Sequence, residues 1–127
     1  MDDLYRELIM DHYRSPRHAG LLAPHDISYE DENPLCGDRI HLTLRVDAEG
    51  IITAVGWEGD GCAISQAAAS LLYEDLVGRP LDYAKNLTAE EVLERVGVAL
   101  SPVRVKCALL SLKVLKAGAY GLDQNGT

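Results

Sequence analysis

Basic residues are scarce in this 127-residue chain: 12 lysines and arginines stand against 20 aspartates and glutamates, which gives a formal net charge of −8. Nucleic-acid binding relies on a concentrated basic surface, so this composition argues against DNA or RNA and favours a protein partner. The chain also has no apolar run approaching the roughly 20 residues that a helix needs to cross a bilayer. We therefore expect no membrane-spanning segment.

Export signals and disulfide frameworks are missing as well. The first residues include Asp2 and Asp3 rather than a basic and then apolar stretch, so we expect a soluble cytoplasmic protein. Only three cysteines are present, and an odd number argues against a disulfide framework and leaves thiols for metal or sulfur chemistry. The length fits one domain over residues 1–127, without repeats and with 123–127 as a flexible tail.

Hydrophobic periodicity predicts a helix and then a small sheet in the first half of the chain. Apolar residues recur at three- and four-residue intervals over 4–13, and this helix must stop before Pro16. Residues 39–46 alternate between apolar and polar, as in a half-buried strand, and 51–57 are β-branched and aromatic. The two segments read as an antiparallel hairpin, and 27–30 add an edge strand.

The second half of the chain reads as helices. One helix follows Cys62 and is closed by Gly78, a second begins at a capping box formed by Thr88 and Glu91, and the last begins at Ser101. This order predicts an α+β domain, in which a small antiparallel β-sheet of about three strands carries helices packed on one face.

The three cysteines stand where the backbone turns or a helix begins. Cys36 precedes the first long strand, Cys62 opens the helix after the hairpin, and Cys107 lies in the first turns of the last helix. Its three- and four-residue spacing puts Cys107 on one inward face with Val103, Leu110 and Val114. Cys62 and Cys107 are both expected to face the unpaired amides of a helix N-terminus, which favour the thiolate. Intervals of 26 and 45 residues exclude a local Cys-x-x-Cys site. The predicted topology allows all three sulfurs to meet at one end of the molecule, where they would form one shared metal site.

Asp38 and nearby cations complete this hypothesis. Asp38 follows Cys36 by two residues, so its carboxylate is the candidate fourth ligand beside the three sulfurs. Three thiolates and a carboxylate leave a divalent ion with excess negative charge, which Lys106, Arg39 or Arg104 would offset. Soft sulfur ligands select zinc, copper(I) or iron–sulfur clusters over calcium or magnesium. Zinc and a [2Fe–2S] cluster, or iron, are the leading occupants.

Several motifs, spread over nearly the whole chain, carry a family resemblance. They are Asp11-His12-Tyr13, Ser15-Pro16-Arg17, Asn33-Pro34, Cys36-Gly37-Asp38, Gly61-Cys62-Ala63-Ile64-Ser65 and Pro102-Val103-Arg104-Val105-Lys106-Cys107. With these motifs the chain resembles the IscU/SufU/NifU-N family of iron–sulfur cluster assembly proteins. The family fold, a small antiparallel sheet with helices packed against it, is similar to the one that patterning predicts.

The resemblance implies a function and partners. Persulfide sulfur would pass from a cysteine desulfurase of the IscS or SufS type to Cys107, with Lys106 as charge support. The protein would then scaffold or relay a [2Fe–2S] cluster for apo iron–sulfur proteins or a downstream scaffold. Cys36, Asp38, Cys62 and Cys107 would hold the metal and the cluster. Such a protein is a scaffold or sulfur carrier more than a turnover enzyme, with sulfurtransferase activity as an open alternative.

One position departs from the IscU branch and keeps two other readings open. The IscU branch carries histidine before the third cysteine, where this chain has Lys106, whose protonated amine cannot bind a metal. The same position is basic in SufU proteins, which look like zinc-dependent sulfur acceptors without a stable cluster. A third reading is an interaction module in which zinc has only a structural role and staples the domain together, since structural zinc contributes folding free energy directly.

Overall fold

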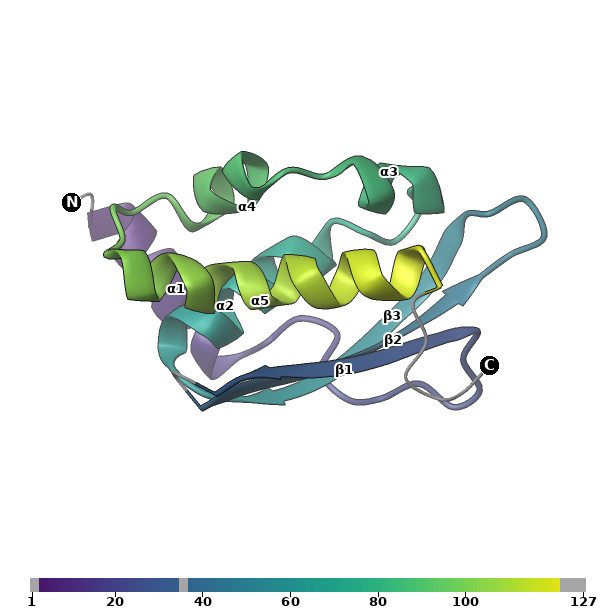
Figure 1. The fold of residues 1–127 in the computed structure, drawn as a ribbon, viewed down its shortest axis with the longest axis horizontal. Coiled ribbons are helices and arrows are strands. Elements are labelled where there is room, and N and C mark those ends of the chain that lie inside the picture. Colours follow the sequence, from purple (N-terminus) through teal and green to yellow (C-terminus); the bar gives the residue numbers. More distant parts are fainter. Residues whose placement is uncertain (1–2, 35–36, 122–127) are drawn as a thin grey trace.

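The computed structural model describes residues 3–34 and 37–121. The elements follow in the order α1 (Asp3–Arg14), β1 (Ile27–Asn33), β2 (Asp38–Val46), β3 (Ile52–Asp60), α2 (Ala63–Glu74), α3 (Leu81–Asn86), α4 (Ala89–Val96) and α5 (Pro102–Ala119). The strands form one antiparallel sheet in the order β1-β2-β3, and α2 to α5 lie over one face of it (Figure 1). The predicted α+β class is confirmed. In these two ranges no helix is both long and apolar enough to span a membrane.

β2 is the central strand, and the alternation along it directs apolar side chains toward the helices. Ile40, Leu42 and Leu44 have no exposed surface. The predicted hairpin of β2 and β3 is confirmed, with Leu42 opposite Trp57. β1 pairs with the other edge of β2 as far as Asn33, three residues beyond the predicted strand. The prediction stopped early because this part of β1 is rich in carboxylates, which are poor strand formers.

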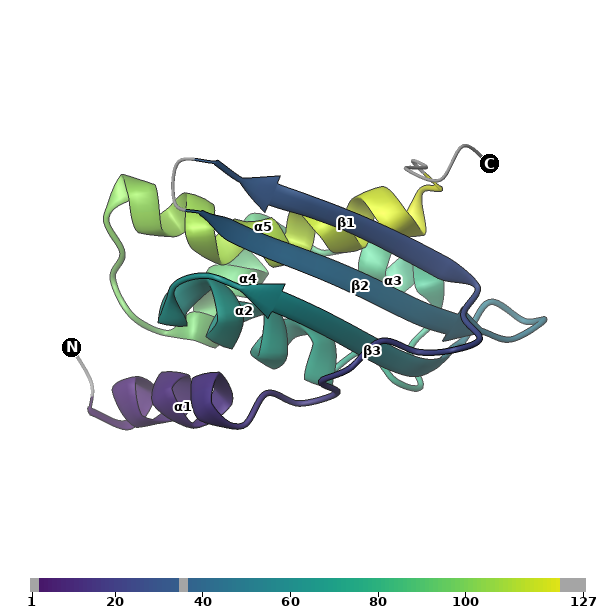
Figure 2. The same cartoon turned by 90° about the horizontal axis from the view of Figure 1, so that it is seen from below.

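Helices α2 and α5 pack against the inner face of the sheet. The Trp57 ring meets the Tyr73 ring edge to face, with 5.8 Å between the centroids. The Tyr73 hydroxyl donates to the backbone carbonyl of Ser111 at 2.7 Å, and burial raises the pKa of Tyr73 well above its usual value. α1 packs on α2, beyond the β3 edge of the sheet (Figure 2). The core therefore lies between the sheet and the pair α2 and α5.

The region after α2 differs from the prediction. α2 ends at Glu74 with Asp75 as its C-cap, and Gly78 belongs to the turn that follows, where its φ is +89°. The Asp75 carboxylate accepts hydrogen bonds from Arg79 and Arg95, which ties this turn to α4. The prediction missed α3 because its six residues are too few to display a helical period.

The starts of α4 and α5 are confirmed in detail. The Thr88 hydroxyl accepts from the Glu91 N–H, the Glu91 carboxylate accepts from the Thr88 N–H, and Gly97 ends α4 with φ of 73°. The Ser101 hydroxyl accepts from the Arg104 N–H at 3.4 Å and caps α5. α5 thus begins at the same end of the molecule as β2 and α2 (Figure 1).

Candidate metal centre

Three predicted ligands lie together at this end of the fold. One carboxylate oxygen of Asp38 and the Sγ atoms of Cys62 and Cys107 all lie within 4.8 Å of one another. They come from the first residue of β2, the N-cap of α2 and the second turn of α5. The fold therefore gathers residues that the sequence holds far apart. Cys36, the fourth predicted ligand, lies outside the described residues, and its place in the site stays a prediction.

The Asp38 carboxylate is buried, and only one of its two oxygens has a hydrogen-bond partner among the described residues. Asp38 has no exposed surface, and its Oδ1 accepts a hydrogen bond from the backbone N–H of Cys62 at 3.0 Å. Its Oδ2 is buried without a hydrogen-bond partner among residues 3–34 and 37–121. Leaving a buried polar atom unpaired costs about 1 to 3 kcal/mol, and more when the group is charged. A cation beside Cys62 and Cys107 would satisfy this oxygen, so the residues present fit a metal ion.

Gly61 allows the close approach of Cys62 to Asp38. Its φ of +138° lies in a region that L side chains rarely adopt. A Cβ atom at this position would also lie 2.1 Å from Asp38 Oδ1, far inside van der Waals contact. Only glycine, therefore, lets the chain pass over the carboxylate and begin α2 directly afterwards.

Cys62 lies at the helix N-terminus, as predicted. It is the N-cap of α2, where its Sγ accepts from the Ser65 N–H at 3.4 Å, and it is partly exposed. A sulfur at this place faces the first-turn amides and the positive end of the helix dipole. Of the two cysteines that the structure describes, Cys62 is thus the more accessible.

Cys107 reaches the site by a different route. It is the sixth residue of α5, so the first-turn amides that the prediction assigned to it lie a turn away. Its side chain is 1% exposed, and Leu110 and Val114 are buried on the same face of the helix, as the periodicity predicted. Val103 was expected on that face but is 55% exposed, because α5 begins beyond the edge of the core. Packing of α5, and not helix capping, brings this thiol to Asp38.

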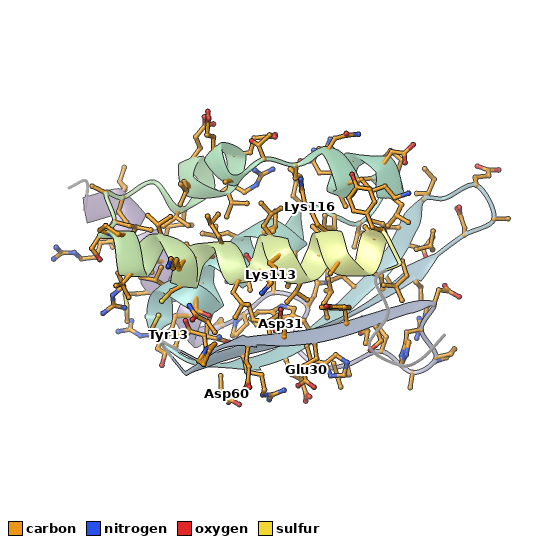
Figure 3. All side chains as sticks on the ribbon, in the orientation of Figure 1. Tyr13, Glu30, Asp31, Asp60, Lys113 and Lys116 are labelled. Carbon is orange, nitrogen blue, oxygen red and sulfur yellow. The ribbon has the colours of Figure 1, made fainter. Side chains whose placement is uncertain are left out.

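The cations near the site have different partners. Arg39 donates to Glu30 and, at 3.1 Å, to Asp60, and these two carboxylates hold the pKa of Arg39 above its usual value. Figure 3 shows Glu30 and Asp60 on the side of the sheet away from the helices. Arg39 is thus occupied on the outer face. Lys106 is exposed and forms no ion pair among the residues that the structure describes, so its predicted charge support stays a prediction.

Gln66 is a supporting residue that the sequence reasoning missed. Its side-chain amide donates to the backbone carbonyl of Asp60 at 2.9 Å and to the Ser65 hydroxyl at 3.0 Å. These bonds fix the end of β3 to the first turn of α2 and so hold the segment that carries Cys62. The sequence could have indicated this role, because Gln66 lies four residues after Cys62, one turn into the predicted helix, and therefore on the same face as Cys62.

A helix-covered antiparallel sheet with two thiols and a buried carboxylate gathered at one end defines a small α+β protein with a candidate site for a thiophilic metal. The chain belongs to the NifU-like N-terminal domain family, which it matches over residues 4–125. The resemblance found in its motifs is thereby confirmed.

Curated relatives of this chain have two kinds of name. The zinc-dependent sulfurtransferase SufU of Bacillus subtilis (strain 168) is 36% identical, over 93% of this chain and 90% of SufU. The iron–sulfur cluster assembly scaffold protein IscU is 35% identical in Aquifex aeolicus (87% of this chain, 71% of IscU) and 32% identical in Escherichia coli K12 (89% of each). Both kinds align with most of the chain.

Solved structures match the fold. A SufU protein from Fervidobacterium islandicum AW-1 superposes with a TM-score of 0.74 at 29% identity, over 89% of this chain and 94% of that one. A NifU-like N-terminal domain from Brucella abortus gives 0.73 over 98% of each chain, and at 22% identity this likeness concerns the fold alone.

Proposed function

We propose that this protein accepts sulfur from a cysteine desulfurase and scaffolds or relays it for [2Fe–2S] cluster formation and delivery to apo-proteins. The observation that carries the proposal is the meeting of Asp38, Cys62 and Cys107 within 4.8 Å, with one buried Asp38 oxygen lacking a partner in the described part of the chain. The SufU and IscU relatives support it by their names. We place this activity in the cytoplasm, where thiols stay reduced.

Four residues would hold the metal: Cys36, Asp38, Cys62 and Cys107. Three sulfurs and a carboxylate suit tetrahedral zinc, and the same sulfurs suit iron. When bound, the metal would keep the coordinating thiols deprotonated. A growing cluster is the cargo of the site, and the Asp38–Cys62 hydrogen bond keeps two of its ligands in place while it forms.

Cys107 is the proposed sulfur acceptor. Its thiolate attacks the outer sulfur of the persulfide on the desulfurase, a new S–S bond forms, and the old S–S bond breaks. The electron pair leaves on the desulfurase cysteine as a thiolate, so the transfer needs no external oxidant or reductant. Lys106, the preceding residue, would offset the negative charge that gathers at the acceptor.

Labelling with radioactive sulfur tests this role. A cysteine desulfurase is supplied with labelled cysteine, and the label on this chain is measured without reductant for wild type, Cys107→Ser and Cys62→Ser. We expect wild type to be labelled, Cys107→Ser to lose most of its label, and Cys62→Ser to retain part of it. Equal labelling of wild type and Cys107→Ser contradicts the role of Cys107.

A zinc-dependent sulfurtransferase without a stable cluster is the second candidate. It is favoured by Lys106, which takes the place of a potential histidine ligand, and by the 36% identity to SufU. Anaerobic reconstitution with iron and sulfide separates the two candidates. A cluster that activates an apo-ferredoxin supports the scaffold, whereas tightly held zinc with sulfur transfer and no transferable cluster supports the sulfurtransferase. Zinc binding without any sulfur transfer would leave only the stapled interaction module.

A further inference from the structure

An apolar groove lies beside the candidate metal centre. It has a volume of about 390 Å³ and runs between the end of β1 and the first turns of α5. Pro34, Leu109 and Leu110 form its apolar lining. Lys106 and Lys113 lie along the α5 side, and Glu32 and Asn33 lie along the β1 side. Lys106 directly precedes Cys107, so one end of the groove adjoins the proposed sulfur acceptor. The groove shares no residue with the ligand group of Asp38, Cys62 and Cys107.

The α5 side of this groove is basic in a protein that is otherwise acidic. α5 contains four of the 12 basic residues of the chain and no acidic residue, although the net charge of the whole chain is −8. We define the basic stripe as Lys106, Lys113 and Lys116, which follow one another at seven- and three-residue steps along one side of the helix. A surface of this sign attracts acidic groups, while the rest of the molecule repels them.

Most of the charge on the stripe is available to a partner. Lys113 pairs with Asp31 of β1 at 3.0 Å, and its side chain is still 67% exposed. Figure 3 shows Lys113 over Asp31, with Lys116 farther along α5. Lys106 and Lys116 form no ion pair within 3–34 and 37–121. Lys116 lies beyond the residues that line the groove. The groove thus combines an apolar lining with two lysines on its α5 side that an incoming carboxylate can reach, and Glu32 lies on its β1 side.

We infer that this groove docks an extended acidic segment of the protein that donates sulfur to Cys107. This inference rests on the proposed function, and it adds the surface on which the sulfur-donating desulfurase would bind. Apolar side chains of the segment would pack on Leu109 and Leu110, and its carboxylates would meet the basic stripe. Docking there places the donor persulfide next to α5 at the level of Cys107. A nucleic acid is disfavoured by the acidic surface that surrounds the stripe.

The test measures sulfur transfer from the desulfurase at increasing concentrations of this chain. The test variant is Lys113→Gln/Lys116→Gln, which removes two positive charges outside the proposed ligand set. Arg6→Glu, at an exposed position of α1, changes the net charge by the same amount and is the matched control. Asp31→Asn is a second control, because it breaks the Asp31–Lys113 ion pair but keeps the lysine. Thermal unfolding of every variant checks the fold.

We expect the double variant to raise the KM for this chain about three- to tenfold with kcat unchanged, and to weaken its dependence on salt. Arg6→Glu is expected to stay near wild type, and Asp31→Asn, which releases Lys113 to a partner, is expected to leave the KM unchanged or to lower it. A double variant that transfers sulfur with the KM of Arg6→Glu overturns the docking site and leaves the proposed function intact. A change in self-association instead of KM identifies a second copy of this chain as the occupant and also overturns it. Wild type that accepts no sulfur overturns the proposed function and this inference together.

Discussion

Asp38 and Cys62 are joined by a hydrogen bond from the Cys62 backbone N–H to the buried Asp38 carboxylate, across 24 residues of sequence. This bond occupies Oδ1, and Oδ2 has no hydrogen-bond partner among the described residues. One oxygen of the same carboxylate lies within 4.8 Å of the Sγ atoms of Cys62 and Cys107. The start of β2 and the start of α2 are thereby held together at the candidate metal centre.

Gly61→Ala tests the close approach over Asp38. The new Cβ would collide with Asp38 Oδ1 and would sit at a φ of +138°, so we expect unfolding free energy to fall by about 2 to 4 kcal/mol. Gly78→Ala is the matched control, because Gly78 also has positive φ but has open space around its missing Cβ, and it is expected to cost about 1 kcal/mol. Urea unfolding measures both. Equal losses in the two variants would show that the contact with Asp38 contributes nothing.

Asp38→Ala tests the carboxylate as a metal ligand. Removing the oxygen that lacks a partner should weaken zinc binding by at least about tenfold, measured by competition with a chelator. Zinc should accordingly raise the unfolding temperature of wild type and raise that of the variant much less. Asp60→Ala, which removes a nearby carboxylate that is 76% exposed, is expected to bind zinc as wild type does. Unchanged zinc affinity in Asp38→Ala argues against its place in the ligand set.

The Sγ atoms of Cys62 and Cys107, within 4.8 Å of each other, predict a disulfide in metal-free protein. Diamide, a two-electron oxidant, should take two electrons and two protons from the thiols and form an intramolecular bond, found by peptide mapping under non-reducing conditions. Zinc added first should slow the reaction strongly, because both thiols would then be bound to the metal. Identical rates with and without zinc would count against shared coordination, and Cys62→Ser should form no such bond.

Local patterns predicted the elements of this protein better than they predicted the contacts of its site. Alternation fixed the faces of β2, and the Thr88 capping box fixed the start of α4, because both signals act within a few residues. The Asp38–Cys62 hydrogen bond and the role of Gly61 were beyond such reasoning, since they depend on how two distant turns meet. The prediction for Val103 was wrong for the same reason. Its spacing along α5 is that of a core residue, but α5 begins beyond the edge of the core, so Val103 is exposed.

His12 predicts how stability depends on pH. It lies on α1, buried against α2, where its Nδ1 and the Ser70 hydroxyl are hydrogen-bonded at 2.7 Å. The same hydroxyl accepts from the Arg17 N–H at 2.9 Å. Burial lowers the pKa of His12 and the positive charge of Arg17 lowers it further, although Glu74 and Asp11 act in the opposite direction. The folded state therefore binds this proton less readily than the unfolded state does.

The sign of the pH effect follows. The contribution of neutral His12 to the free energy of unfolding is fully present above the ordinary histidine pKa of about 6.5. It is lost as the pH falls from there toward the lower pKa that His12 has in the folded protein. We expect the unfolding free energy, measured in urea, to decline between about pH 7 and pH 5, as His12 takes up a proton in its buried position. His12→Gln should flatten this decline, while His25→Gln, at an exposed position, should keep it. A decline of the same steepness in His12→Gln would assign the pH dependence to other groups.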